Sequence, residues 1–297
     1  MIPPMSTTAV SAAGRDRLMV LAAAVLFSTG GAAVKASTLG GWQVACLRSA
    51  IAALAIAALV PAARRAWNWR IWLVGSAYAS TMILYVLANK LTTAANAIFL
   101  QSTAPLYILL LGPWLLGERI RLRQLALMAA LAAGMALFFV GRQPALATAT
   151  DPLLGNILGT ASGLSWAACI MGLRWLGRGA DDVGATSAAV CCGNLLAAAA
   201  ALPMALPIAG ATPADWAIIA FLGLFQIGVA YAFLVRGVRR VPAFEVSLLL
   251  LAEPVLNPVW AWLVHGEQPS GWALLGGAVI IAATAAQALS RPGDDRS

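Results

Sequence analysis

The sequence is 297 residues long, 61% hydrophobic and only 10% charged, with a net charge of +8. No soluble domain of this size contains so much apolar surface, so the composition excludes a soluble protein and predicts an all-α polytopic membrane protein. The positive charge does not indicate nucleic-acid binding, because the basic residues are scattered singly between apolar runs. The four cysteines lie within apolar runs, with neither metal-ligand spacing nor a disulfide framework.

Residues 1–14 lack hydrophobic periodicity and are predicted to form a disordered cytoplasmic tail, and residues 291–297 form a second cytoplasmic tail. Between them lie ten apolar runs, each about as long as the ~20 residues that a helix needs to cross a bilayer. The predicted spans are 18–37, 42–60, 71–89, 94–113, 123–141, 152–173, 183–203, 216–236, 243–264 and 271–289. The first run has a full membrane width, so we interpret it as an uncleaved span rather than a secretion signal.

The basic residues predict the orientation of the chain. With the N-terminus inside the cell, 15 arginines fall in cytoplasmic segments, and only Lys35, Lys90 and Arg142 fall on the opposite side. Arg48 lies within the second span. By the positive-inside rule, both termini are predicted to be cytoplasmic.

The chain contains the same unit twice. Shifting Ser247–Glu267 back by 149 positions aligns it with Ile98–Glu118, so that Pro254 falls on Pro105 and a Gly-Glu pair recurs at the end. Ten spans in two halves give five spans each, and because five is odd, the second half enters the membrane from the opposite side. The sequence therefore predicts two inverted repeats, an arrangement typical of secondary transporters.

These paired blocks resemble the EamA-type members of the drug/metabolite transporter superfamily, and in particular its amino-acid exporters. The residues that carry the resemblance are Ala94-Ala95-Asn96-Ala97, Pro105, Gly117-Glu118, Ala243, Leu249, Glu253-Pro254 and Gly266-Glu267, together with Leu47-Arg48 and Ser165-Trp166. The resemblance covers about residues 18–289. Its motifs are specific for the family and distinguish poorly between substrates.

The resemblance implies ten transmembrane helices arranged as two inverted five-helix repeats, the first over residues 15–141 and the second over residues 142–290. It also implies a transporter that moves small organic solutes by alternating access, with a central cavity lined mainly by spans one, three, four, six, eight and nine. The two repeats differ at one position, because Ala104 stands where the second repeat has Glu253. Any role of a carboxylate there is therefore asymmetric.

Glu253 lies midway along the ninth predicted span and is the main candidate functional residue. An ionisable residue at membrane depth is costly and marks a functional site by default. Its functional interpretation is a proton-coupling carboxylate or an anchor for a substrate amine. The alternative is a carboxyl group that bonds backbone donors or a hydroxyl beside the neighbouring kink. Asn257, one turn further on, shares this face.

Three prolines, Pro105, Pro254 and Pro258, are predicted to break or kink the fourth and ninth spans and to act as hinges. A broken helix survives in lipid only where the break faces protein or a watery cavity. The prolines therefore favour a cavity near the middle of the membrane.

Seven more side chains with polar tips lie well inside spans three, four, six and eight, and we predict that they line the substrate cavity together with Glu253 and Asn257. They are Tyr78, Tyr85, Gln101, Tyr107, Trp166, Gln226 and Tyr231. Several such groups at one depth suit a substrate with an apolar or aromatic body. The alternative for each residue alone is packing or an interfacial position.

Three charged residues are possible partners for other charges: Arg48, Lys35 and Glu245. Arg48 either snorkels outward, pairs with a buried acid or attracts a carboxylate substrate, and the same alternatives hold for Lys35; a structural role is preferred for both. Glu245 is a candidate for an inner-gate salt bridge with Arg239 or Arg240, with a solvated pair as the alternative.

Two acids and the single histidine receive structural interpretations. Glu118 and Glu267 directly precede spans five and ten, where an acid stabilises a helix N-terminus. His265 is predicted to be an interfacial residue at the outer end of span nine.

We therefore predict an inner-membrane secondary transporter that exports amino acids, with aromatic or bulky apolar ones as first candidates, or related small metabolites. A channel-like facilitator of small organic solutes is the alternative, and an intramembrane enzyme ranks below it, since no acid–base or metal constellation can be assembled. No phosphate-binding glycine loop is present, so an ion gradient, with protons as the candidate ion, supplies the energy. The predicted partners are a small solute and the lipid bilayer, without nucleic acid, metal or cofactor.

Overall fold

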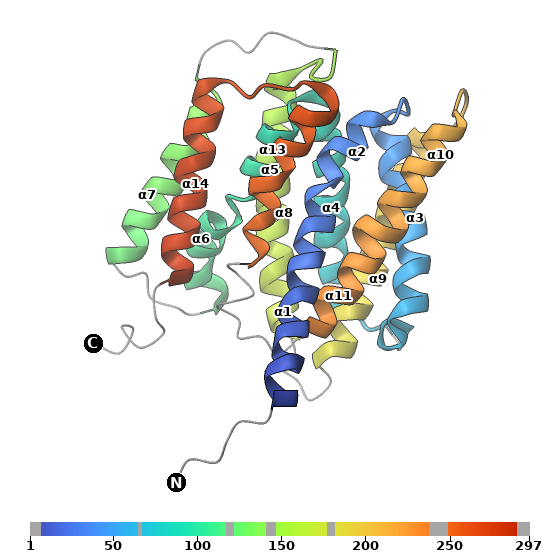
Figure 1. Ribbon diagram of the computed structural model, residues 1–297, viewed down its shortest axis with the longest axis horizontal. Helices are drawn as coiled ribbons and strands as arrows, with labels where there is room; N and C mark the ends of the chain where they lie inside the picture. Colours follow the sequence, from blue (N-terminus) through green and yellow to red (C-terminus); the bar gives the residue numbers. More distant parts are fainter. Residues whose placement is uncertain are drawn as a thin grey trace.

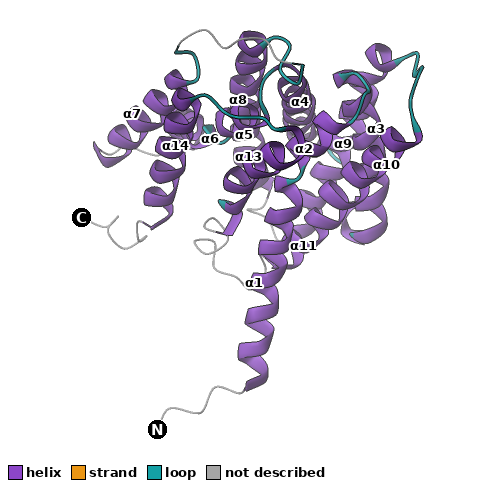
Figure 2. Cartoon of the chain, turned by 45° about the horizontal axis from the view of Figure 1, so that its top comes forward, coloured by secondary structure: helices purple, strands orange, loops and turns teal. Residues whose placement is uncertain are grey.

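The computed structural model describes residues 7–64, 67–116, 122–140, 147–176, 182–237 and 249–289. Within these ranges every regular element is a helix, and none forms a strand (Figure 2). This confirms the predicted all-α class. The helices lie side by side in a bundle, in which α7 and α14 form an outlying pair (Figure 1).

The elements of the first half follow the predicted spans closely. They are α1 (Thr7–Ser28), α2 (Gly30–Ala36), α3 (Gly41–Leu59), the short 3₁₀-helix η1 (Pro61–Arg64), α4 (Trp69–Leu91), α5 (Ala94–Gln101), α6 (Ala104–Leu116) and α7 (Leu122–Leu137). Helix α1 begins at Thr7, so it includes part of the stretch that the sequence analysis assigned to a tail. The first and fourth spans each consist of two helices that are separated by a short turn.

The second half repeats this pattern of helices. Its elements are α8 (Pro152–Leu176), α9 (Asp182–Ala205), α10 (Pro213–Ala220), the π-helix η2 (Phe221–Val229), α11 (Ala230–Gly237), α13 (Ala252–His265) and α14 (Gly271–Leu289). The eighth span is one continuous helical stretch whose centre is wound as a π-helix. Such wide turns are rare and are found frequently at functional sites.

Within the part of the chain that the structure describes, seven helical stretches are long and apolar enough to cross a membrane. They are Gly14–Ala36, Gly41–Leu59, Trp69–Leu91, Ala94–Leu111, Pro152–Leu173, Gly184–Ala205 and Pro213–Gly237. Two shorter apolar helices, Leu125–Leu137 and Gly271–Ala286, lie at predicted spans five and ten. Helix α13 occupies span nine, whose first residues, 243–248, lie outside the described ranges.

Large apolar side chains cover much of the outer surface of the bundle. Leu54 is 70% exposed, Leu263 61% and Leu153 64%, and each belongs to a different helix. In water such a surface would cause aggregation, whereas lipid tails solvate it at no cost. The exposed surface therefore fits a protein that is surrounded by a bilayer.

The two halves enter the bundle from opposite ends. Lys35, at the end of α2, bonds the carbonyl oxygen of Thr92, which follows α4. The backbone N–H of Asp151, which precedes α8, donates to the carbonyl oxygen of Leu91 at 3.0 Å. The first span therefore ends where the sixth begins. We call this the Lys35 end; α1 starts and α14 finishes toward the opposite end (Figure 1).

Helices that correspond in the two repeats pack against each other, as an inverted repeat requires. Helix α3 packs on α9, and α7 packs on α14. At the second contact Gly134 and Gly276 face each other so closely that a Cβ on Gly276 would lie 2.6 Å from the carbonyl oxygen of Gly134. Small residues permit such close approach of helices in lipid.

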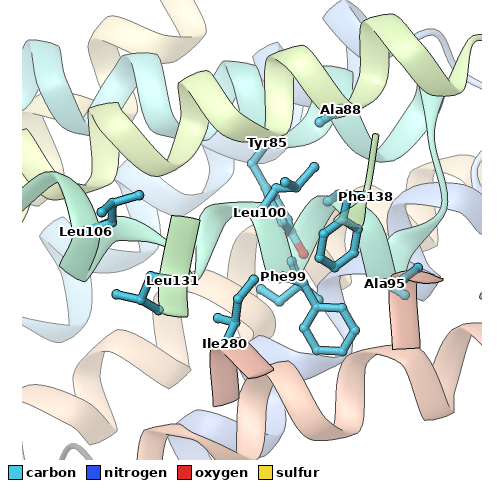
Figure 3. Close-up of a cluster of buried hydrophobic side chains, with 12 residues drawn as sticks. Tyr85, Ala88, Ala95, Phe99, Leu100, Leu106, Leu131, Phe138 and Ile280 are labelled. Atoms are coloured by element: carbon cyan, nitrogen blue, oxygen red, sulfur yellow. The ribbon is translucent and has the colours of Figure 1, made fainter. Parts of the chain in front are cut away.

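A cluster of buried apolar side chains joins this outlying pair to the centre of the bundle. Phe99 of α5 meets Phe138, just after α7, with ring centroids 5.9 Å apart, and Leu131 and Ile280 complete the contact from α7 and α14 (Figure 3). Tyr85 enters the same cluster from α4. The apolar body of Tyr85 is thus fixed by packing, and its hydroxyl group is left for polar contacts.

Candidate functional site

The fourth and ninth spans are interrupted at equivalent positions. Helix α5 ends at Gln101 and α6 begins at Ala104, while a turn at Leu251 precedes α13. Ser102 of the first turn and Leu251 are 149 residues apart, which is the repeat distance. Each break therefore lies at the same point of its repeat.

The predicted hinge prolines lie on the C-terminal side of these breaks. Pro105 and Pro254 occupy the first turns of α6 and α13, where the missing N–H has no intrahelical acceptor to lose. Pro258 lies inside α13, which continues past it to His265. The structure thus places the interruption just before Glu253 and Pro254 rather than among the prolines.

Tyr85, Asn257 and Glu253 come together from opposite halves of the chain. The buried Asn257 amide donates to the Tyr85 hydroxyl, with Nδ2 and Oη 3.1 Å apart. Glu253 lies one turn earlier on α13, half-buried, and close enough to Tyr85 to interact with it electrostatically. The carboxylate of Glu253 makes neither a hydrogen bond nor an ion pair within the described ranges.

Arg48 is almost entirely buried in α3, with 1% of its surface exposed. Its Nη2 donates to the carbonyl oxygen of Met82 at 3.1 Å and contacts the Met82 sulfur at 3.6 Å, whereas its Nε has no partner. No carboxylate of the described residues pairs with it. Arg48 therefore does not snorkel outward, and among the described residues it pairs with no acid. Tyr78 and Tyr85 are near enough to interact with it electrostatically.

Three aromatic candidates gather at one buried cluster. Tyr78 is buried in a cluster with Cys169 and Val190, and Trp166 and Tyr231 pack against that cluster. Tyr231 and Tyr78 are also electrostatic neighbours. One row of electrostatic neighbours thus links Tyr231, Tyr78, Arg48, Tyr85 and Glu253.

Gln226, on the π-helix η2, contacts the turn that divides the first span. Its Nε2 donates to the carbonyl oxygen of Phe27 at 3.2 Å, while its Oε1 is buried without a partner. From α13, Trp260 Nε1 donates to the hydroxyl of Ser28 at 2.9 Å. Polar groups of the eighth and ninth spans therefore hold the turn at Thr29.

Asn257 reaches the same turn through Gly31. A Cβ at Gly31 would clash with the Asn257 side chain, because it would lie 2.4 Å from Oδ1 and 3.0 Å from Nδ2. The absence of a side chain at Gly31 therefore leaves the space in which Asn257 bonds Tyr85.

Two predicted cavity residues of the fourth span lie apart from this row. The hydroxyl of Tyr107 faces Met135 Sδ on α7 at 3.5 Å. Gln101 ends α5 with its Oε1 buried and unpartnered. The contacts of the described residues do not join either of them to Tyr85 or Glu253.

Lys35 and Glu267 form a buried ion pair at the Lys35 end. Lys35 Nζ lies 2.9 Å from Glu267 Oε1, with side chains 1% and 2% exposed, and it also donates to the carbonyl oxygens of Thr92 and Thr148. Glu267 Oε2 accepts from the backbone N–H of Ala94 at 2.9 Å. We call these contacts the Lys35 network.

This arrangement corrects the interpretation of Glu267. Its place in the sequence predicted a role at the start of span ten. In the structure Glu267 instead caps α5, at the start of span four. The ion pair also gives Lys35 a structural partner, which is one of the alternatives predicted for it. His265, predicted to be interfacial, is half-buried, with Nε2 2.8 Å from the carbonyl oxygen of Ala32.

A second set of bonds closes the connection between α2 and α3. The buried Asp215 accepts from the hydroxyls of Ser37 at 2.8 Å, Thr38 at 2.7 Å and Thr212 at 2.6 Å. Lys90 Nζ donates to the Ser37 carbonyl oxygen at 2.6 Å. Four elements are thereby tied together next to the Lys35 network.

The Asn96 of the sequence motif belongs to the same end of the bundle. Asn156 of α8 accepts through Oδ1 from Asn96 Nδ2 at 3.0 Å and from the Thr92 hydroxyl at 2.8 Å, and it donates to the Phe138 carbonyl oxygen at 2.9 Å. This motif residue thus joins the two repeats.

Some candidate residues lie outside the described residues, namely Glu245 with its predicted partners Arg239 and Arg240, and Glu118. All four cysteines are buried and free. The described part of the chain contains no group of three or more His, Cys, Asp or Glu side chains that could hold a metal ion.

Sequence reasoning missed several residues of the site. Asp215 carried a local signal, since Thr212 and Asp215 have the spacing of a helix capping box. Trp260 and the Lys35–Glu267 pair carried none, because their partners are more than 200 residues away in the sequence.

Comparison with known proteins identifies one family and one fold. The sequence model of the EamA-like transporter family matches residues 17–140 and 153–287. A search of curated proteins finds no match. One solved structure, described only as a crystal structure of a protein, shares 22% sequence identity with a TM-score of 0.60, over 92% of this chain and 96% of that chain. At this identity the likeness concerns the fold alone.

Proposed function

Because this chain belongs to the EamA-like transporter family, we propose that it is a secondary transporter that exports amino acids or related small metabolites across the bacterial inner membrane. Family membership itself makes it a membrane transporter of small solutes. The substrate class, the direction and the mechanism of alternating access are the parts that we propose.

The observation that carries the proposal is the meeting of Tyr85, Asn257 and Glu253. Tyr85 comes from the first repeat and the other two from the second, directly after a break in the ninth span. Secondary transporters bind their substrates near the middle of the membrane, where the repeats meet and helices are discontinuous. An acid without a partner at such a point supports a role in contact with the substrate or in proton coupling.

The aromatic residues next to this group support a substrate with an apolar body. Tyr78 is buried beside Arg48, and Trp166 and Tyr231 pack on the same side. Ligand sites are lined mainly by apolar and aromatic side chains with a few polar groups that fix the orientation. Aromatic or bulky apolar amino acids are therefore the first substrates to test.

Alternating access is supported by the bonds at one end of the bundle. The Lys35 network and the contacts of Asp215 join α2 to α5, α10 and the ends of α4 and α13 there. The distribution of arginines supports a cytoplasmic location for the opposite end, with both termini. We propose that the Lys35 end faces outward and is closed in this state, so that substrate enters from the cytoplasm.

Transport by purified protein in proteoliposomes tests this function. A panel of labelled amino acids is offered with and without a pH gradient, and we expect saturable, competable movement of a few of them. Asn257→Ala is expected to slow this movement, whereas Thr284→Val, which loses only a bond to its own helix, is the control.

Three outcomes separate the alternatives. Movement that does not saturate and never accumulates solute against a gradient would support a channel-like facilitator. If no amino acid of the panel moves while the protein remains folded, the amino-acid assignment is wrong. A chemical change in an offered solute would support an intramembrane enzyme.

A further inference from the structure

Two opposite charges lie in the centre of the bundle without pairing with each other. Arg48 is buried and uses one nitrogen, Nη2, for a carbonyl oxygen and a sulfur of Met82. These contacts do not neutralise its charge. A buried cation at membrane depth is normally paired, because its desolvation is otherwise uncompensated.

The acid is Glu253, at the start of α13. Its position in the first helical turn stabilises a negative charge there. Its oxygens nevertheless accept no hydrogen bond within the described chain, and it forms no ion pair there. Within the described chain, neither charged group thus has a counter-charge.

Tyr85 is linked to both charges by geometry. It lies one turn after Met82, whose carbonyl oxygen accepts from Arg48, and its hydroxyl bonds Asn257, one turn after Glu253. Its hydroxyl oxygen accepts from Asn257, so its own O–H remains free to donate. A cationic group, a hydroxyl donor and an anionic group therefore follow one another within the site.

We propose that this row binds the two charged groups of a zwitterionic α-amino acid, with Arg48 and the Tyr85 hydroxyl on the carboxylate and Glu253 on the ammonium group. The proposal deepens the proposed function and rests on it. A guanidinium has donors in a planar fork that matches a carboxylate, and here Nε is unused. A dicarboxylate would be repelled by Glu253, and a diamine by Arg48, so the site selects a ligand with one charge of each sign.

Analogues that lack one charge test the proposal in the wild-type protein. Proteoliposomes take up a labelled amino acid, and its unlabelled form, its methyl ester and its desamino acid compete. The ester lacks the carboxylate and the desamino acid lacks the ammonium group. Loss of a desolvated charged contact weakens binding by at least about 30-fold, and we expect both analogues to compete that much more weakly.

Two variants assign the charges to residues. In Arg48→Gln the parent amino acid and its methyl ester should compete equally, while the desamino acid remains weak. Glu253→Gln should show the reverse, with the desamino acid now equal to the parent. Arg48→Lys keeps the charge and should retain part of the discrimination, and Arg64→Gln, at an exposed arginine, is the control.

The outcomes separate this inference from the function on which it rests. If the wild type transports amino acids but accepts the ester and the desamino acid equally well, recognition of the charges is wrong and the transport function stands. If either variant loses discrimination against the other analogue instead, the assignment of residues is wrong. If no amino acid moves at all, the proposed function fails first and this inference falls with it.

Discussion

At the scale of single residues, the centre of this transporter depends on atoms that meet across long sequence distances. Tyr85 and Asn257 are 172 residues apart, and their bond joins α4 to α13. Asn257 also packs directly on Gly31, which is far from it in the sequence. Small changes at these positions should therefore have large effects.

Removing the hydroxyl of Tyr85 should destabilise the fold. Tyr85→Phe leaves the buried Asn257 amide without its acceptor, and we expect the free energy of unfolding to fall by about 1–2 kcal/mol. Tyr107→Phe is the matched control, because that half-buried hydroxyl donates to the weak acceptor Met135 Sδ. Thermal unfolding in detergent measures both. Equal losses in the two variants would contradict the importance of the Tyr85–Asn257 bond.

Adding a methyl group at Gly31 should have a similar effect for a steric reason. Gly31→Ala drives a Cβ into the Asn257 carboxamide, and we expect a loss of about 1–3 kcal/mol. Combining it with Asn257→Ala should recover part of this loss, since the smaller side chain leaves room. Gly271→Ala, with no atom within 4 Å of the added Cβ, is the control. A melting temperature equal to that of the wild type would show that the turn at Thr29 shifts to make room for the added methyl group without loss of stability.

At the scale of elements, the interrupted helices are the distinctive feature of the fold. The fourth and ninth spans break 149 residues apart, and the first span turns at Thr29. The turn at Thr29 is held by side chains of other helices, since Gln226 bonds the Phe27 carbonyl oxygen and Trp260 bonds the Ser28 hydroxyl. At the start of α5, Glu267 of the Lys35 network accepts from the backbone N–H of Ala94.

The Lys35–Glu267 pair should contribute as a unit. Lys35→Met leaves a buried carboxylate without its counter-charge, and we expect a loss of about 3–5 kcal/mol. The double variant Lys35→Met/Glu267→Gln removes both charges and should lose much less than the sum of the two single variants. Unfolding of the four proteins completes a double-mutant cycle. Strictly additive losses would show that the two residues act independently.

At the scale of the whole molecule, the inverted repeats and the charge distribution lead to one orientation. The four native cysteines are buried, so a single introduced cysteine reports accessibility with little background. Ala209 lies in an exposed connection at the Lys35 end, and Arg64 is exposed at the opposite end.

Labelling with a membrane-impermeant maleimide checks the orientation. We expect Ala209→Cys to react in intact cells and Arg64→Cys to react only after the membrane is opened. This follows from the excess of arginines on the side of the termini. The reverse pattern would place the termini outside the cytoplasm and would turn the proposed direction of transport around.

Much of the architecture followed from the sequence alone. Apolar runs of membrane length predicted the spans, since each run can satisfy its own backbone only as a helix. The shift of 149 residues and the odd number of spans per repeat predicted the inverted arrangement, because both depend on counting along the chain. The family resemblance also followed from the sequence, because the paired motifs that carry it are found by comparing positions along the chain. Glu253 and Asn257 were recognisable because polar groups inside an apolar run are costly.

Only the tertiary structure decided how the candidates are grouped. It brought Tyr85 to Asn257, left Arg48 without an acid among the described residues, and paired Lys35 with Glu267. It also separated Tyr107 from the central row, although its sequence context matched that of the others. The physical reason is that a one-dimensional pattern specifies the depth and the face of a residue within its own helix. Which helix lies opposite is decided by packing between segments far apart in the chain.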